Sequence, residues 1–307
     1  MLAWIGGRAR WVMPAGILLA ILLPQLAALV RPALPVLVCL TLGLGMARLD
    51  PGAVLRGALA PGRAGLLIGL TLLLLPGWAL AVWLVARAAG LPSDWLPALV
   101  QAGLAPPIAS AAGLCLIMGL RARLALELTL TGTLLTPLVG PAMLPLLLGA
   151  DLPLAAGPLA LRLMLTLTGA VAVALILRVV AGPARIAAAG RSFDGIVALA
   201  MAAFFLALFD GFVDLVAADP ARAAGLALAA VILNTATVLA VARIGRAAGM
   251  AEASGLGVAA GNRTVALYLA VLPPDPVAQL FTALYQIPMS LTPALGRWLQ
   301  PPSAASA

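Results

Sequence analysis

The chain has 307 residues, of which 64% are hydrophobic and only 9% are charged, and its mean hydropathy is +1.16. A soluble domain carries about a quarter of charged residues, so this composition excludes a water-soluble globular protein. All 18 basic residues are arginine, and the formal net charge is +8. Because the arginines lie singly between hydrophobic runs, we interpret their excess as a signal of membrane orientation and not of nucleic-acid binding.

The apolar runs are continuous, which predicts membrane helices, since the strands of a membrane barrel would alternate polar and apolar residues. A spanning helix needs about 20 apolar residues, and the chain offers ten such runs. The predicted spans are residues 11–30, 33–48, 64–87, 95–120, 122–148, 158–180, 193–216, 222–243, 248–272 and 274–298. The predicted joints are Arg31-Pro32, Asp50-Pro51-Gly52, Leu91-Pro92-Ser93-Asp94, Gly182-Pro183, Asp219-Pro220 and Pro273-Pro274-Asp275. We interpret the first run as a helix and not as a signal peptide, because further spans follow it directly.

The arginines also predict an orientation in a bacterial inner (plasma) membrane, with both termini in the cytoplasm. With that choice the inner set is Arg8, Arg10, Arg48, Arg56, Arg63, Arg121, Arg123, Arg178, Arg185, Arg191, Arg243, Arg246 and Arg297. The outer set is Arg31, Arg87, Arg162 and Arg222, and the outer acids are Asp94, Asp151, Asp219 and Asp275. Arg263 belongs to neither set, because it falls within a span. The tail Pro301–Ala307 is short and rich in small residues.

Two of the spans contain interruptions, at Leu104–Ser110 and at Gly255–Thr264. Two successive prolines cannot sit inside a regular helix, and three glycines followed by Asn-Arg-Thr also predict unwound backbone. The interruptions occupy the fourth and the ninth span, which are matching places in two halves, residues 1–150 and 151–307. Five helices per half make the two copies inverted, and paired broken helices in such a repeat indicate a site at the membrane midplane. The alternative is that each interruption only kinks a packed helix.

Three stretches resemble the bile acid:sodium symporter family. They are Ala105-Pro106-Pro107-Ile108-Ala109-Ser110-Ala111-Ala112, Leu134-Leu135-Thr136-Pro137 and Gly261-Asn262-Arg263-Thr264-Val265-Ala266-Leu267-Tyr268-Leu269-Ala270. The resemblance implies an all-α integral membrane fold with ten transmembrane helices in two inverted five-helix repeats. It also implies a panel domain of spans one, two, six and seven and a core domain of spans three to five and eight to ten. Spans four and nine would cross at their breaks beside two sodium ions, and the substrate would be an organic anion.

The resemblance carries over only some of the sodium ligands. The threonine of the family's fifth helix falls on Thr129, and its conserved Asn falls on Asn262, but its Glu and Gln fall on Gly257 and Gly261. Of the polar pair in the fourth helix only Ser110 is near. The resemblance therefore implies the fold and leaves sodium coupling, proton coupling or no coupling open.

The polar residues inside the spans are the candidate site. The substrate-binding candidates are Pro106, Pro107, Ser110, Asn262, Arg263, Thr264, Tyr285, Gln286 and Ser290. The ion-coupling candidates are Thr129, Glu127, Asn262 and Val258, with a sodium ion at Thr129 and Ser110 as the one cofactor considered. A charge at the bilayer centre costs several kcal/mol unless it is paired or hydrated. Arg263 would attract an anionic substrate, replace the sodium charge, or pair with freed carbonyl groups.

Other polar residues have simpler explanations. Glu127 follows Arg123 by four residues, so an ion pair is favoured, with a proton-coupling carboxylate as the alternative. Asn234, Thr235, Thr237 and Gln101 are expected to form hydrogen bonds between helices. Cys39 and Cys115 are expected to be core residues.

No phosphate loop, metal-binding His-Glu motif or nucleophile elbow is present, so we expect no enzyme. The sequence therefore predicts a secondary active transporter of a small organic anion that works by alternating access in the lipid bilayer. The first alternative is a non-transporting structural or sensory membrane protein with the same fold. An arsenite-type or auxin-type carrier is the second, but Cys115 lies several residues beyond the proline pair. Substrate identity, direction and oligomeric state stay open.

Overall fold

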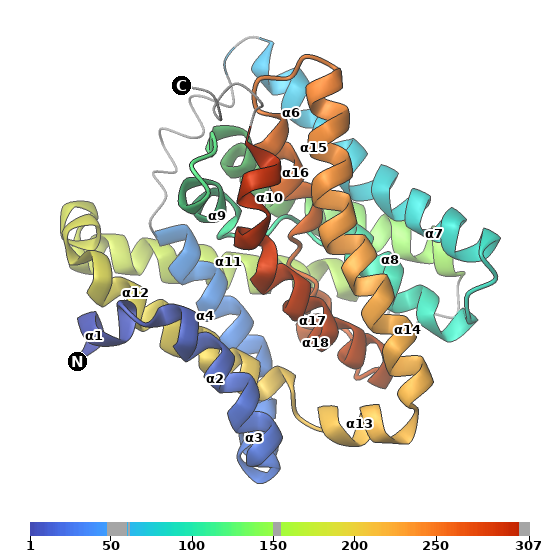
Figure 1. Cartoon of the computed structure of the whole chain (residues 1–307), viewed down its shortest axis with the longest axis horizontal. Coiled ribbons are helices and arrows are strands. Elements are labelled where there is room, and N and C mark those ends of the chain that lie inside the picture. Colours follow the sequence, from blue (N-terminus) through green and yellow to red (C-terminus); the bar gives the residue numbers. More distant parts are fainter. Residues whose placement is uncertain (48–59, 61, 150–154, 301–307) are drawn as a thin grey trace.

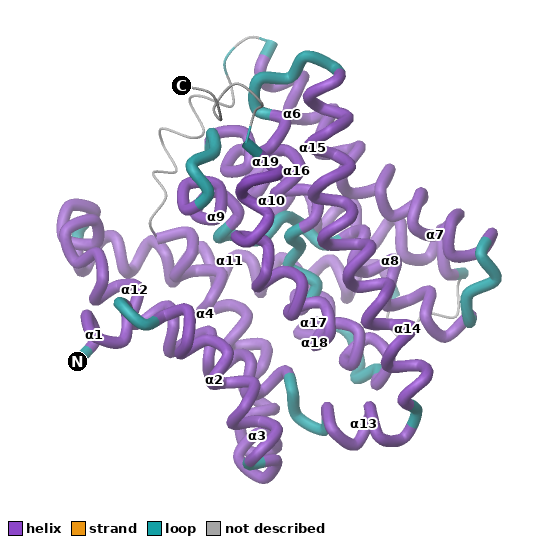
Figure 2. Tube along the Cα trace, viewed as in Figure 1, coloured by secondary structure: helices purple, strands orange, loops and turns teal. Residues whose placement is uncertain are grey.

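A computed structural model describes residues 1–47, 60, 62–149 and 155–300 (Figure 1). The joint Asp50-Pro51-Gly52, the residues Arg48, Arg56 and Asp151, and the tail 301–307 lie outside the described residues. The described part of the chain is helical and contains no strand, which confirms the all-α prediction (Figure 2).

In chain order the helices are α1 (Leu2–Gly6), α2 (Ala9–Leu22), α3 (Pro24–Val30), α4 (Leu34–Ala47), α6 (Arg63–Leu72), α7 (Trp78–Ala88), α8 (Leu96–Leu104), α9 (Ala111–Ile117), α10 (Arg123–Leu148), α11 (Ala156–Ala181), α12 (Pro183–Leu208), α13 (Phe212–Ala218), α14 (Pro220–Val231), α15 (Thr237–Ala247), α16 (Ala253–Gly261), α17 (Ala266–Val271), α18 (Pro276–Leu291) and α19 (Gly296–Leu299). Short 3₁₀ turns cover Arg31–Ala33, Ser93–Trp95 and Thr292–Leu295. Two π-helical turns, Leu73–Gly77 and Ile232–Ala236, join α6 to α7 and α14 to α15.

Six helices in the described residues are long and apolar enough to cross a membrane. They are Pro24–Ala47, Arg63–Ala88, Arg123–Leu148, Ala156–Ala181, Ala188–Ala218 and Pro220–Ala247. Their outward faces are apolar: Val179 is 83% exposed and Leu146 is 74% exposed. Such surfaces are stable in hydrocarbon and unstable in water. The chain is therefore a multi-pass membrane protein, which confirms the coarse prediction.

The predicted joint at Arg31-Pro32 is wrong. One helical segment runs from Pro24 to Ala47 through this position, with a 3₁₀ turn at Arg31–Ala33 that accommodates the proline. The break lies earlier, at Leu23, which has φ −129° and ψ 68°. A residue before proline is driven out of the α region, so Pro24 ends α2 at Leu22. The first predicted span, residues 11–30, is accordingly divided between α2 and α3.

The interruptions predicted in residues 95–120 and 248–272 are present. The first of these segments consists of α8 and α9, and the second of α16 and α17. The backbone leaves the helical region directly after each leading half, at Ala105 (ψ 138°) and at Asn262 (ψ 102°). Figure 2 shows both loops in teal near the middle of the molecule.

The helices pack in two groups. In the first bundle, α4 packs against α11 and α12, and α1 and α2 pack along α12. In the second bundle, α7 packs on α8, α15 on α16, α14 on α18, and α10 against α8, α9 and α16. The bundles meet where α4 and α11 contact α17 and where α10 contacts α11.

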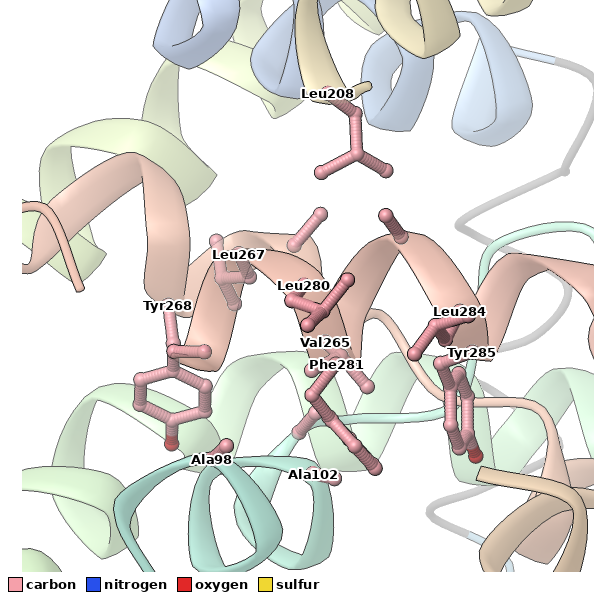
Figure 3. Close-up of a cluster of buried hydrophobic side chains, with 14 of the residues drawn as sticks. Ala98, Ala102, Leu208, Val265, Leu267, Tyr268, Leu280, Phe281, Leu284 and Tyr285 are labelled. Carbon is pink, nitrogen blue, oxygen red and sulfur yellow. The ribbon is translucent and has the colours of Figure 1, made fainter. Parts of the chain in front are cut away.

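Apolar side chains fill the centre of the second bundle. Figure 3 shows Tyr268 from α17, Phe281 and Tyr285 from α18, and Ala98 and Ala102 from α8 gathered in one cluster. Leu208 at the end of α12 belongs to the same core cluster. Helices α8, α16 and α17 therefore lie within a packed protein interior, whereas α9 exposes Leu116 and Ile117 at the surface.

Candidate functional site

The two interruptions pair with each other. The Ile108 N–H donates to the Asn262 carbonyl (2.9 Å), and the Thr264 N–H donates to the Pro106 carbonyl (2.9 Å). Pro107 and Arg263 face each other in this short antiparallel bridge. Unpaired backbone groups are costly where water is absent, so each break satisfies part of the other. We call the paired residues 105–108 and 262–264 the crossing.

The proline pair leaves carbonyl groups without donors. In a helix the N–H of residue i donates to the carbonyl of residue i−4. Pro107 has no N–H, so the Gly103 carbonyl loses its helical donor. The end of α8 adds further free carbonyls, among them that of Ala105. Because these carbonyl oxygens are buried, they need hydrogen-bond donors from another part of the protein.

Arg263 supplies those donors. Its side chain is among the largest fully buried ones, and the residue is only 2% exposed. Its Nε donates to the Ala260 carbonyl at 2.6 Å. Its Nη1 lies 2.8 Å from the Leu74 carbonyl, 2.9 Å from that of Ala105 and 3.2 Å from that of Gly103, and shares its two hydrogens among them.

The guanidinium carries a surplus in both charge and hydrogen bonding. Its Nη2 is buried and has no hydrogen-bond partner. The ion pairs of Arg63, Arg123 and Arg222 do not include Arg263. No described carboxylate therefore pairs with Arg263. The crossing holds one fixed positive charge that only carbonyl dipoles compensate.

A second set of side chains holds the end of α16. The Gly261 carbonyl accepts hydrogen bonds from Tyr285 Oη (2.5 Å) and from Asn234 Nδ2 (2.7 Å). The Asn262 amide oxygen accepts from Thr292 Oγ1 at 2.8 Å. Asn234, Asn262 and Thr292 are fully buried. These bonds join α14–α15, α16 and the end of α18, so the second break has a defined geometry.

Both π-helical turns contribute to the crossing. The turn Leu73–Gly77 contains Pro76 and presents the Leu74 carbonyl to Arg263. The turn Ile232–Ala236 presents Asn234 to the Gly261 carbonyl. A π turn redirects groups that a regular helix would keep paired, and such turns are frequent at functional sites.

The structure brings together most of the predicted substrate-binding residues. Pro106, Pro107, Asn262, Arg263 and Thr264 form the crossing, and Tyr285 contacts it through Gly261. Thr129 lies beside it: its hydroxyl donates to the Ala125 carbonyl at 2.8 Å and lies 3.3 Å from the Ile108 carbonyl. Val258 is buried, and its carbonyl accepts from the Asn262 amide.

Three predicted residues are not drawn into the crossing by any described contact. Ser110 is exposed and precedes α9. Ser290 is also exposed, and its hydroxyl donates within α18 to the Gln286 carbonyl. Gln286 is buried, but its amide nitrogen donates to the Thr282 carbonyl of the same helix, and its amide oxygen has no partner.

The positions that the resemblance assigns to sodium do not fit that ion. A Cβ atom on Gly257 would lie 2.5 Å from the Val238 carbonyl oxygen, and one on Gly261 would lie 2.4 Å from Val238 Cγ2. Neither position has room for a ligand side chain, because α15 lies directly against α16. The Thr129 hydroxyl keeps its oxygen lone pairs, but Ser110 is exposed and no described hydrogen bond joins it to Thr129.

Glu127 belongs to an ion network at the start of α10. Its carboxylate accepts from Arg123 Nε (2.8 Å), which confirms the predicted ion pair. It also accepts from Arg63 Nε (2.8 Å) and Nη2 (2.5 Å), and Arg63 Nη2 contacts Glu252 at 2.9 Å. Two arginines therefore contact one buried carboxylate. The geometry therefore supports an ion pair more than a proton-coupling group.

Sequence reasoning missed three contributors to this region. Tyr268 is fully buried and its hydroxyl lies 3.4 Å from the Leu104 carbonyl. The signal for it was one tyrosine in an otherwise apolar run. The Leu74 carbonyl was indicated only by Pro76 inside a span. Arg63 gave no local signal as a partner of Glu127. The predicted interhelical role of Asn234 is confirmed, whereas that of Thr235 and Thr237 is wrong, because their hydroxyls bond within their own helical segment.

Fold and site together define a helical multi-pass membrane protein in which two interrupted helices pair at a buried arginine. Comparison of the chain with protein-family models and with curated protein sequences finds no match.

Proposed function

We propose that the chain is a secondary active transporter that carries a small organic anion by alternating access. The observation that carries this proposal is the crossing, where two interrupted helices bring non-helical backbone and one buried arginine charge together. Non-helical backbone at membrane depth is tolerated where it is buried in protein or lines a cavity. Paired broken helices are the characteristic substrate site of secondary carriers.

The order of elements supports an inverted repeat of five spans. In one half a π-interrupted helix (α6–α7) is followed by a broken pair (α8, α9) and by α10. In the other half a π-interrupted helix (α14–α15) is followed by a broken pair (α16, α17) and by α18. The same sequence of irregularities occurring twice favours ten spans over six. It also supports the resemblance to the bile acid:sodium symporter family.

The packing supports a division of labour between the two bundles. The first bundle would be the panel, and the second bundle, which holds the crossing, would be the core. Few polar contacts join them: Arg31 Nη2 donates to Gln279 Oε1 (3.0 Å), Gln279 Nε2 donates to the Asp210 carbonyl (2.6 Å), and Arg162 Nη1 donates to the Val271 carbonyl (3.0 Å). All of these lie at the same end of the bundles, so the opposite end is freer to open.

The charge of the crossing supports an anionic substrate. Arg263 has no described carboxylate partner, and its Nη2 keeps its hydrogens for a ligand. Guanidinium groups bind carboxylates through charge-assisted hydrogen bonds. A small carboxylate in contact with Nη2 would satisfy the guanidinium nitrogen of Arg263 that has no hydrogen-bond partner.

Flux measurements test this proposal. The purified protein is reconstituted in liposomes, and uptake of a panel of labelled mono- and dicarboxylates and bile acids is measured. We expect wild-type flux of at least one anion, loss of that flux in Arg263→Gln, and normal flux in Arg222→Gln. Arg222 is the matched control because it is half exposed and pairs with Asp94 away from the crossing. Equal flux in wild type and Arg263→Gln, with both proteins folded, would refute the role of Arg263.

One observation favours a second candidate, a non-transporting structural or sensory membrane protein. Three of the five guanidinium N–H groups of Arg263, those on Nε and Nη1, donate to backbone carbonyls. Glycines in α16 also let this helix pack closely on α15. Such packing is what a static membrane subunit needs. A folded, reconstituted protein that moves no anion of the panel would favour this candidate.

A further inference from the structure

The guanidinium of Arg263 lies where half-helix ends would otherwise require a bound cation. We propose that Arg263 is a resident cation that compensates the carbonyl ends of α8 and α16, so that the crossing uses no dissociable monovalent cation. The transport part of this inference rests on the proposed function, whereas the electrostatic part depends only on the contacts of Arg263.

Four backbone carbonyl oxygens surround the guanidinium of Arg263. Carbonyls of Ala260, Leu74, Ala105 and Gly103 lie 2.6 to 3.2 Å from Nε or Nη1. They come from three separate segments: the end of α16, the π turn Leu73–Gly77 and the end of α8. A set of converging carbonyl oxygens is an arrangement that binds small hard cations. Here a side chain occupies that arrangement.

The C-terminal ends of α8 and α16 carry partial negative charge. Each helix C-terminus carries about half an elementary negative charge. The ends of α8 and α16, nine residues each, therefore contribute on the order of one negative charge together. The single positive charge of Arg263 offsets these two ends, and the N-termini of the short helices α9 and α17, which follow the breaks, add partial positive charge. A second cation at the same place would leave the crossing with an uncompensated positive charge.

Helix α16 has no room at its two glycines for a side chain that could bind a cation. The face of α16 that packs on α15 carries Gly257 and Gly261, and an added Cβ at either would lie within 2.5 Å of an atom of Val238. The buried carboxylate of Glu127 is bound by Arg63 and Arg123 instead. The described residues therefore offer this position no carboxylate with which to attract a free cation. A covalently attached cation also cannot leave, and so cannot link transport to an ion gradient.

A rescue experiment tests the resident cation. In Arg263→Ala the oxygens stay but the cation is lost, and thermal unfolding of the purified variant is followed in detergent. We expect a lower midpoint than in wild type, a rise of that midpoint with guanidinium chloride at concentrations far below denaturing ones, and no rise with choline chloride. Wild type and the control Arg222→Ala should show no such rise. A folded Arg263→Ala that guanidinium does not stabilise more than choline would overturn the proposal.

A measurement on the wild type covers the case in which Arg263→Ala does not fold. Its unfolding midpoint is compared in sodium, potassium and choline salts of equal concentration, and flux of the identified anion is compared with the same cations outside. We expect equal midpoints and equal flux. A sodium-specific rise in either quantity would refute the resident cation.

The two proposals fail in different ways. If no anion is transported but guanidinium restores Arg263→Ala, the function is wrong and the resident cation stands. If an anion is transported only with sodium, the function stands and the resident cation is wrong.

Discussion

The close contact between α15 and α16 predicts how far an alanine at Gly257 lowers the free energy of unfolding. In Gly257→Ala the new methyl group would lie 2.5 Å from the Val238 carbonyl oxygen, 2.8 Å from Ala242 Cβ and 3.0 Å from Ala242 N. All three are backbone or Cβ atoms, so no side-chain rotation relieves the clash. The two helices must move apart, and with them the end of α16 that positions the crossing.

Two opposing contributions, helix propensity and overpacking, decide whether Gly257→Ala raises or lowers the free energy of unfolding. Alanine is favoured over glycine inside a helix by about 1 kcal/mol. Overpacking a filled interior costs about 1–3 kcal/mol, and contact with rigid backbone belongs at the upper end of that range. We therefore expect Gly257→Ala to lower the free energy of unfolding by about 1–2 kcal/mol.

Gly69→Ala is the matched control, because Gly69 also lies in a helix and an added Cβ there meets no atom within 4 Å. It should be neutral or stabilising by up to about 1 kcal/mol. Unfolding of both variants in mixed micelles, titrated with a denaturing detergent, measures the difference. If Gly257→Ala proves as stable as Gly69→Ala, the close approach of α15 and α16 is not as described.

Three further predictions use the same unfolding assay or hydrogen exchange. Glu127→Gln removes the charge that binds Arg63 and should destabilise by about 2–4 kcal/mol, as when one partner of a buried pair is lost; a neutral result would show the network to be solvent-screened. Arg31→Ala removes the bond to Gln279 and should speed amide exchange at the start of α18, and unchanged exchange would mean that this bond does not hold the bundles together. Tyr285→Phe removes a donor to the end of α16 and should cost about 1 kcal/mol; no loss would indicate that Asn234 alone satisfies that carbonyl.

The interruptions were predictable because their causes are local. Pro106 and Pro107 are consecutive and both lack N–H groups, which favours a helix end, whereas the separated prolines of α10 remain inside that helix. The pattern at Gly261-Asn262-Arg263 was weaker, yet its place in the second half made the two breaks a pair. The long apolar helices were equally predictable, since length and hydropathy define them without tertiary information.

Other features depend on contacts that no local pattern encodes. The pairing of Arg63 with Glu127 joins residues 64 positions apart in the sequence. The π turn around Asn234 inserts one extra residue without any proline to announce it. The break at Leu23 is not distinguished in the sequence from the predicted joint at Arg31-Pro32. A proline follows directly at both sites, and the local pattern does not tell which of them stays helical.

The two breaks are chemically complementary, and this explains why the arginine sits in the second one. The proline pair removes donors and leaves the first break rich in acceptors, so the partner must be rich in donors. Arg263 faces Pro107 in the antiparallel bridge, and from there its guanidinium reaches back to the Gly103 carbonyl, which Pro107 leaves without a donor, and to the Ala105 carbonyl at the end of α8. The prolines and the arginine thus form one hydrogen-bonding unit, and its single unused donor, Nη2, is the place where a ligand changes the balance.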